Sequence, residues 1–203
     1  NEFARSHRCE ALRESMTLSY PSYILALAMG AGKTTLIGAI IATEFAMAME
    51  YPNMDSAQQF VKNALVFAPG KTILGALREL ADIPFEKILP PRLYKQFAAN
   101  YKLTFTQDGE KTLPIIQGSS FNIIVTNTEK IRIQKSTGNR RANNTIAKLF
   151  DTKEKEDAEI ANLRLQALAS LPNLGIFSDE AHHLNGQALD KDLKKVRKTV
   201  DYL

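Results

Sequence analysis

The stretch LALAMGAGKTT, residues 25–35, joins an apolar run to a glycine-rich turn and then to a helix-favouring segment. The glycines Gly30 and Gly32 let the backbone turn its N–H groups towards one point. The helix that follows directs its positive end to the same point, and both effects favour a multiply charged anion. An apolar strand, a glycine turn and Lys33 at the start of a helix are the context that a phosphate-binding loop requires.

We therefore predict a nucleotide-binding set made of Gly30, Ala31, Gly32, Lys33, Thr34 and Thr35. In this set Lys33 meets the β- and γ-phosphates. The Thr34 hydroxyl is a magnesium ligand, because this hard cation takes oxygen donors, while Thr35 stands one place too late for that role. The full eight-residue pattern begins with glycine, where this chain has Leu27, so a plain glycine turn is the alternative interpretation.

A second motif, IFSDEAHH at residues 176–183, ends an apolar strand in two adjacent carboxylates. In open α/β folds, ligands bind at the carboxyl edge of the sheet, where such a strand delivers Asp179 and Glu180. We expect Asp179 to hold magnesium, directly or through a water. Glu180 would orient or deprotonate the water that attacks the γ-phosphate, and His182 is read as a coupling residue. Taken alone, these residues would be a solvated turn and a surface or core histidine.

Composition limits the class of protein. The chain has 203 residues and is 44% hydrophobic, which suits one soluble domain over residues 1–203. Its net charge of +4 is too small to decide whether it has a polyanionic partner. A single cysteine, Cys9, cannot form an internal disulfide, so the cytoplasm is the expected compartment. Zinc is not expected, because Cys9 and His7 have no ligand spacing with His182 and His183.

Residues 23–49 are apolar or small over a length that could cross a membrane. Glycines and Lys33 stand at the centre of this stretch, where a lysine costs about 2.5–3.5 kcal/mol on insertion scales, so no membrane partner is expected. The chain starts without Met, and it ends soon after a helical pattern at residues 190–203. These ends lead us to expect a piece of a longer protein.

Strands alternate with helices along the chain, which predicts a parallel sheet with helices on both faces. Helical spacing of apolar residues follows the first two strands, around Leu36–Phe45 and Ile73–Leu80. Residues 85–120 contain three prolines and read as irregular, with room for a strand near residues 103–105. The expected strands are Tyr23–Ala28, Ala64–Ala68, Phe121–Thr126 and Leu174–Ser178.

Residues 130–148 hold six basic residues and no acidic one, which reads as a solvated loop with a weaker suggestion of contact with DNA. The following residues, 151–169, are strongly charged and favour a helix.

These motifs make the chain similar to the first motor domain of superfamily 2 helicases and translocases of the DEAH type, over nearly its whole length. AMGAGKT resembles motif I, VFAPGKTIL at residues 66–74 motif Ia, IIVTNTEKI at residues 123–131 motif Ib, and FSDEAHHL motif II. The SDEAHHL box followed by LKKVRKTVDYL at residues 193–203 most resembles the restriction subunit of type III restriction-modification enzymes.

The resemblance implies a RecA-like P-loop NTPase that uses ATP and Mg2+ and travels along or senses double-stranded DNA. It also implies two partners, a modification (methyltransferase) subunit and a second motor domain that supplies arginines for the transition state. Carried over to this sequence, the residues that contact DNA backbone phosphates are Pro69, Gly70, Lys71, Thr126, Asn127 and Thr128. For Thr126 and Asn127, capping of a following helix is an equal alternative.

Three other classes stay open at this point. A type I restriction motor or another bacterial defence helicase fits nearly as well. A P-loop ATPase or kinase that is not a motor would also bind ATP, although the motifs like Ia and Ib oppose it. A pure binding module without turnover is the third class. The sequence departs from the family in having no clear adenine-reading glutamine motif before Tyr23.

Overall fold

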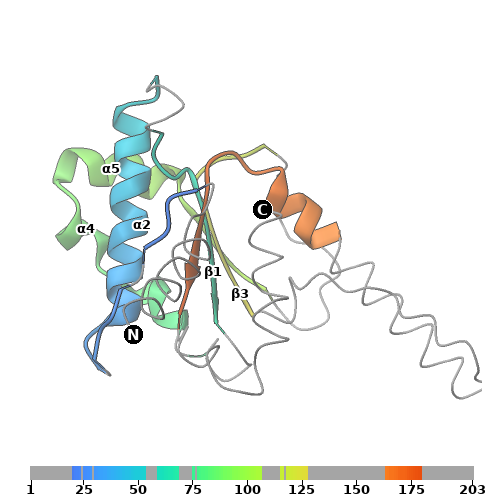
Figure 1. Ribbon diagram of the computed structural model, residues 1–203. Helices are drawn as coiled ribbons and strands as arrows, with labels where there is room; N and C mark the ends of the chain where they lie inside the picture. The colour runs from blue at the N-terminus through green and yellow to red at the C-terminus, as the bar shows by residue number, and fades with distance from the viewer. Residues whose placement is uncertain are drawn as a thin grey trace, which may run out of the picture. The chain divides into compact units, whose positions relative to one another are not determined.

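The computed structural model describes residues 20–23, 25–28, 30–53, 59–68, 75, 77–106, 115–116, 118–127 and 163–179 (Figure 1). The chain divides into two compact units, residues 1–31 and residues 32–203, and each is described by itself. None of the helices among the described residues is long and apolar enough to cross a membrane.

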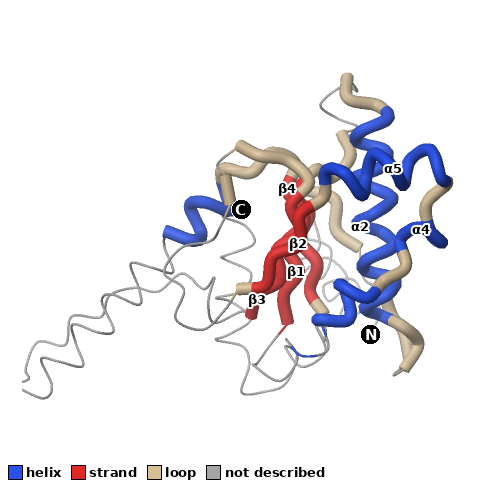
Figure 2. Tube along the Cα trace, turned by 180° about the vertical axis from the view of Figure 1, so that it is seen from behind, coloured by secondary structure: helices blue, strands red, loops and turns tan. Residues whose placement is uncertain are grey.

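The second unit is built on a four-stranded parallel sheet with the strand order β2-β3-β1-β4 (Figures 1 and 2). Because every pair is parallel, the carboxyl ends of all four strands meet at one edge of the sheet. The strands are β1 (Asn63–Ala68), β2 (Lys102–Phe105), β3 (Asn122–Asn127) and β4 (Leu174–Ser178).

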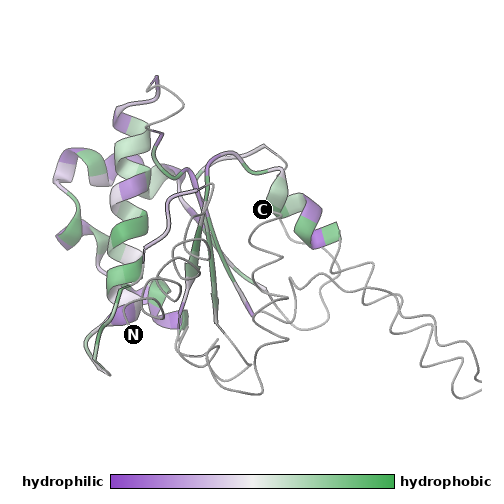
Figure 3. Cartoon of the chain, in the orientation of Figure 1, coloured by the Kyte–Doolittle hydropathy of each residue, from purple (hydrophilic) through white to green (hydrophobic). Residues whose placement is uncertain are grey.

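The middle residues of strands β1 and β3 are apolar because both faces of the sheet are covered. Along β1, Ala64 and Val66 pack into one hydrophobic cluster, whereas Leu65 and Phe67 pack into another. Successive side chains of a strand point to opposite faces, so the two clusters lie on opposite sides of the sheet. Figure 3 accordingly shows predominantly hydrophobic strands, while the helices mix hydrophobic and hydrophilic residues. An uninterrupted apolar run is what such a doubly covered strand requires.

Helix α2 (Lys33–Glu50) covers the first face of the sheet. Its residues Ile37, Ile41 and Phe45 are spaced by four and are buried in the first cluster, as helical periodicity predicts. The helix ends where the Tyr51 N–H donates a hydrogen bond to the Met47 carbonyl, just before a proline. Three further elements add buried residues to the same cluster: the 3-10 helix η2 (Arg78–Asp82), α4 (Phe85–Ile88) and α5 (Pro91–Asn100).

A helix formed by residues 163–169 covers the second face. Leu168 and Leu171, at its end, pack against Leu65, Phe67 and Ile124 of the sheet. The predicted arrangement, a parallel sheet with helices on both faces, is therefore confirmed.

An aromatic cluster fills the space between α2, α5 and the sheet. The rings of Phe97 and Tyr101 stack with centroids 4.5 Å apart, and Phe85 lies 5.0 Å from Phe97. Phe45 of α2 meets the edge of Phe121, with centroids 5.6 Å apart. Aromatic pairs in these geometries add about 0.5–1.5 kcal/mol each beyond the area they bury.

The strand expected at Tyr23–Ala28 is wrong. The described residues of this segment, which belong to the first unit, have no strand structure, and Tyr23, Leu25 and Leu27 are 87%, 56% and 40% exposed. An apolar run becomes a strand only when a neighbouring strand satisfies its backbone groups, and none of the described residues pairs with this run.

The irregular segment expected at residues 85–120 is also partly wrong, because the helices α4 and α5 lie in it, whereas β2 lies where a strand near residues 103–105 was expected. The prolines that suggested irregular chain begin a helix instead: Pro91 occupies the first turn of α5, where its missing N–H is not needed. Of the helix expected around Ile73–Leu80, the described part is mostly the 3-10 helix η2. Residues 130–148 and 190–203 lie outside the described residues.

Candidate functional site

The glycine turn has the backbone conformation that its sequence predicts. In the first unit, Gly30 has φ 74°, and the Ala31 N–H donates a 3.2 Å hydrogen bond to the Ala28 carbonyl. In the second unit, Gly32 has φ 78°. A Cβ atom at Gly30 would meet nothing within 4 Å, and at Gly32 it would make only ordinary contact with Thr35. The backbone conformation, rather than lack of space, therefore requires glycine at both positions.

The first turn of α2 is suited to an anion. Gly32 caps the helix without a side-chain hydrogen bond, and the first hydrogen bond within the helix is from Leu36 N–H to Gly32 O, at 2.9 Å. The helix therefore supplies no acceptor for the N–H groups before Leu36. This turn contains no acidic residue and begins with Lys33, although a cation is unfavourable at the positive end of a helix. A bound polyanion would offset this repulsion between the Lys33 ammonium and the positive end of α2.

The packing of α2 fixes which edge of the sheet its first turn reaches. Near the end of the helix, Glu44 Oε2 accepts a 3.0 Å hydrogen bond from Val61 N–H, and Val61 lies just before β1. The end of α2 is thus beside the amino ends of the strands. Its start, with Lys33 and Thr34, points towards their carboxyl ends, as Figure 1 shows.

Asp179 lies at the same edge. It follows the last residue of β4, and its N–H donates a 2.9 Å hydrogen bond to the Phe67 carbonyl, so β1 holds its backbone. Its side chain is only 7% exposed. The second unit therefore brings Lys33, Thr34 and Asp179 to one edge of the sheet, as the two motifs predict.

The donor set fits a magnesium ion. The Thr34 hydroxyl and the Asp179 carboxylate are both oxygen donors, and Mg2+ is held by one or two such groups together with waters and substrate phosphates. Among the residues that the structure describes, no three His, Cys, Asp or Glu residues gather as a metal-binding cluster. Binding of Mg2+ by this set stays a prediction, and it would need waters and nucleotide phosphates as further ligands.

The carboxyl ends of β2 and β3 carry a further polar group of residues. Thr126 and Asn127 are 0% and 1% exposed, and the Thr126 hydroxyl donates to the Asn127 carbonyl at 3.4 Å. Thr106 donates a 3.0 Å hydrogen bond to the Thr126 hydroxyl. Burial keeps these Thr126 and Asn127 side chains away from a duplex in this conformation, so their contact with DNA stays a prediction. Sequence reasoning missed Thr106, because it lies just after the strand expected near residues 103–105 and belongs to no motif.

The remaining predicted site residues lie outside the described residues. They are the carboxylate Glu180, the coupling residue His182, and the DNA-contacting Pro69, Gly70, Lys71 and Thr128. The zinc alternative involves Cys9, His7 and the two histidines of motif II, all of which are outside as well.

Comparison with known proteins decides the family. Residues 5–203 match the family described as "Type III restriction enzyme, res subunit". The chain belongs to this family. Searches of curated proteins and of solved structures gave no match.

Membership in the res-subunit family agrees with the geometry. The parallel sheet and α2 of the second unit have the RecA-like α/β fold of a P-loop helicase-type domain. The chain therefore carries a helicase-like ATPase domain that binds nucleotide. The predicted family and fold class are confirmed.

Proposed function

We propose that this chain is the ATP- and magnesium-binding half of a DNA-dependent motor, the first motor domain of a type III restriction subunit. The observation that carries the proposal is the convergence of the α2 start and Asp179 at the carboxyl edge of one sheet. Family membership supports the helicase-like ATPase part. The type III activity and the dependence on DNA rest on the motifs alone.

Each residue has a role that its chemistry supports. The N–H groups of the first turn of α2 and the Lys33 ammonium bind the phosphate oxygens of ATP. Thr34 and Asp179 supply oxygen ligands to magnesium, which neutralises charge between the phosphates when bound. Glu180 orients the attacking water or accepts its proton.

We propose that a second motor domain completes the site. In phosphoryl-transfer enzymes, arginines that stabilise the departing phosphate raise the rate by about 10³–10⁵, and we propose that a second motor domain supplies them. The isolated chain should therefore bind ATP weakly and hydrolyse it scarcely at all. Double-stranded DNA and a modification subunit are the proposed partners.

The test is equilibrium binding of a fluorescent ATP analogue to the 203-residue chain and to Lys33→Ala, with and without Mg2+. We expect Lys33→Ala to weaken binding at least about tenfold, because a charge-assisted contact contributes about 1.5–3 kcal/mol. Its melting temperature should change little, since Lys33 is partly exposed.

Lys87→Ala is the matched control, because Lys87 is an exposed lysine on α4 away from the glycine turn. It should bind the analogue like the unmodified chain. Equal affinity of a folded Lys33→Ala variant and the unmodified chain would refute the phosphate-loop assignment.

A further inference from the structure

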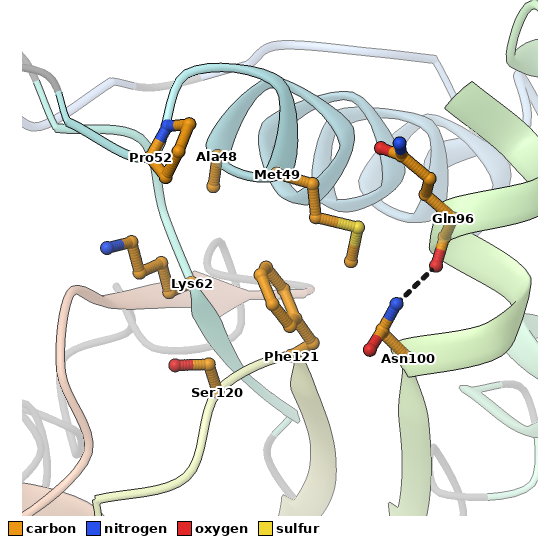
Figure 4. A pocket seen from close by; sticks show the side chains of 8 residues that line it. All are labelled: Ala48, Met49, Pro52, Lys62, Gln96, Asn100, Ser120 and Phe121. Atoms are coloured by element: carbon orange, nitrogen blue, oxygen red, sulfur yellow. Dashed lines mark hydrogen bonds between the residues drawn. The ribbon is translucent and has the colours of Figure 1, made fainter. Parts of the chain in front are cut away.

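A pocket of about 540 Å³ opens at the amino edge of the sheet, the edge opposite the proposed nucleotide site. Strands β1, β3 and β4 are five or six residues long, so about 16–20 Å separates the two edges. Met49, Pro52 and the ring of Phe121 give the pocket apolar walls. Lys62 and Ser120 lie on one side of this ring, and Gln96 and Asn100 lie on the other (Figure 4).

The polar side chains of this pocket have unused hydrogen-bonding capacity. Within the described part of the chain, the partly buried Lys62 ammonium has no ion pair or hydrogen bond, and the Ser120 hydroxyl has no hydrogen bond. Asn100 uses its Nδ2 to donate to the Gln96 main-chain carbonyl at 2.8 Å, which leaves its Oδ1 available (Figure 4). A partly buried cation that has no partner among the described residues favours an anionic ligand.

The backbone of Phe121 is strained at this place. Its φ of 66° lies in the left-handed region, which is rare for a bulky residue and costs about 1–3 kcal/mol. Phe121 N–H donates to the Lys62 carbonyl, and Lys102 N–H donates to the Phe121 carbonyl at 2.9 Å. The strained residue thus joins two lysine backbones and places its ring in the pocket. Strain that is held by the surrounding structure is typical of functional sites.

We propose that this pocket binds a glutamate side chain presented by another polypeptide. Lys62 and Ser120 donate to the carboxylate, and Phe121 and Met49 pack against its methylene groups. A phosphodiester would use the lysine but has no apolar part that needs these walls. The pocket is open to solvent, and a side chain held by a docked segment does not need enclosure. The proposal stands independently of the nucleotide site.

Titration of the ¹⁵N-labelled 203-residue chain with a blocked peptide, acetyl-Ala-Ala-Glu-Ala-Ala-amide, tests the proposal by NMR without ATP or Mg2+. The same peptide with glutamine in the centre is the matched ligand. We expect saturable shifts of the Ser120 and Phe121 amide signals, with the glutamine peptide at least about tenfold weaker because it lacks the charge. Lys62→Gln should remove this preference, and Lys87→Gln should retain it.

Several results would overturn the proposal. They are an absence of shifts, equal binding of the two peptides, or an unchanged preference in a Lys62→Gln variant that melts like the parent chain. Acetate or inorganic phosphate that binds as tightly as the glutamate peptide would identify a general anion site instead. A negative result in any of these peptide titrations does not affect the ATP-binding test, because neither nucleotide nor Lys33 takes part in peptide binding.

Discussion

Asn63 and Asn122 face each other in register on β1 and β3, and Asn122 Nδ2 donates a 2.7 Å hydrogen bond to Asn63 Oδ1. Asn63 Nδ2 donates in turn to the main-chain carbonyls of Ser119 and Pro172, at 3.1 and 2.8 Å. Both asparagines are buried, with 0% and 4% of their surface exposed. One side chain therefore ties the start of β1 to the segments that lead into β3 and β4.

Asn63→Ala should lower the free energy of unfolding by about 2–3 kcal/mol, because it leaves several buried polar groups without a partner. Urea denaturation followed by circular dichroism measures this. Asn53→Ala, in an exposed turn, is the matched control and should change stability by no more than about 0.5 kcal/mol. Equal effects of the two substitutions would show that the network contributes nothing.

Gly32→Ala should reduce both stability and nucleotide affinity. The left-handed φ of 78° costs an alanine about 1–2 kcal/mol, and a shifted turn misplaces the N–H groups of α2. Gly118 is the matched control, because its φ is 73° and a Cβ there would meet nothing within 4 Å. Gly118→Ala should cost similar stability yet leave binding of a fluorescent ATP analogue unchanged. If both variants bound equally well, the Gly32 conformation would have no role in the site.

Glu180→Gln in the full-length protein should retain ATP affinity within about threefold and lose at least about 100-fold in hydrolysis. The amide is nearly isosteric, but it cannot accept the proton of the attacking water. Phosphate release in the presence of duplex DNA measures the rate, and Glu86→Gln, an exposed glutamate on α4, is the control. Turnover by Glu180→Gln at the native rate would exclude the catalytic role.

Asp179→Asn should instead weaken nucleotide binding mainly when Mg2+ is present. The amide keeps the shape of the buried side chain but removes the negative charge that attracts the cation. Binding of the fluorescent analogue, measured with Mg2+ and with a chelator, separates this effect from misfolding. An identical Mg2+ dependence in the variant and the unmodified chain would contradict the assignment of a metal ligand.

Gly175→Ala should destabilise the sheet by about 1–3 kcal/mol through overpacking. A Cβ atom on Gly175 would lie 2.8 and 3.0 Å from the two γ-carbons of Val61. Val61→Ala removes both carbons, so the double variant should lose about 1 kcal/mol less stability than the two single variants together. Urea denaturation of the four proteins checks this, and strict additivity would mean that Val61 is not the obstacle.

Three strands of the sheet were predicted to within one residue, because a short apolar run between helical patterns is typical of a buried strand. The predicted and observed bounds of these strands differ only at their ends. Asn63 belongs to β1 although asparagine is rare in strands. Its hydrogen bonds to main-chain carbonyls replace the hydrogen bonds to water that the side chain loses on burial. Phe121 was predicted to begin β3, but it has a left-handed backbone just outside the strand.

The placement of Lys33 and Asp179 at the carboxyl edge of the sheet was predictable, because each residue stands in a motif next to a single element. Prediction failed where the structure depends on distant partners. The segment around Leu25 has the composition of a strand, yet only a neighbouring strand can turn such composition into structure. Likewise, no local signal reveals that Thr106 meets Thr126, twenty residues away. The pocket at the amino edge combines four separate segments and has no motif.

The placement of β4 beside β1 has a consequence for synthesis on the ribosome. The contact between Asn63 and Pro172 spans 109 residues, so β1 leaves the ribosome long before its neighbour exists. At about 5–20 residues per second, this delay is roughly 5–20 s. During that time one edge of β1 exposes unpaired backbone groups, which is an opportunity for aggregation or for binding by a chaperone. Asp179 follows β4, the last strand among the described residues, so a nascent chain cannot complete the proposed metal-binding edge until this strand has been made.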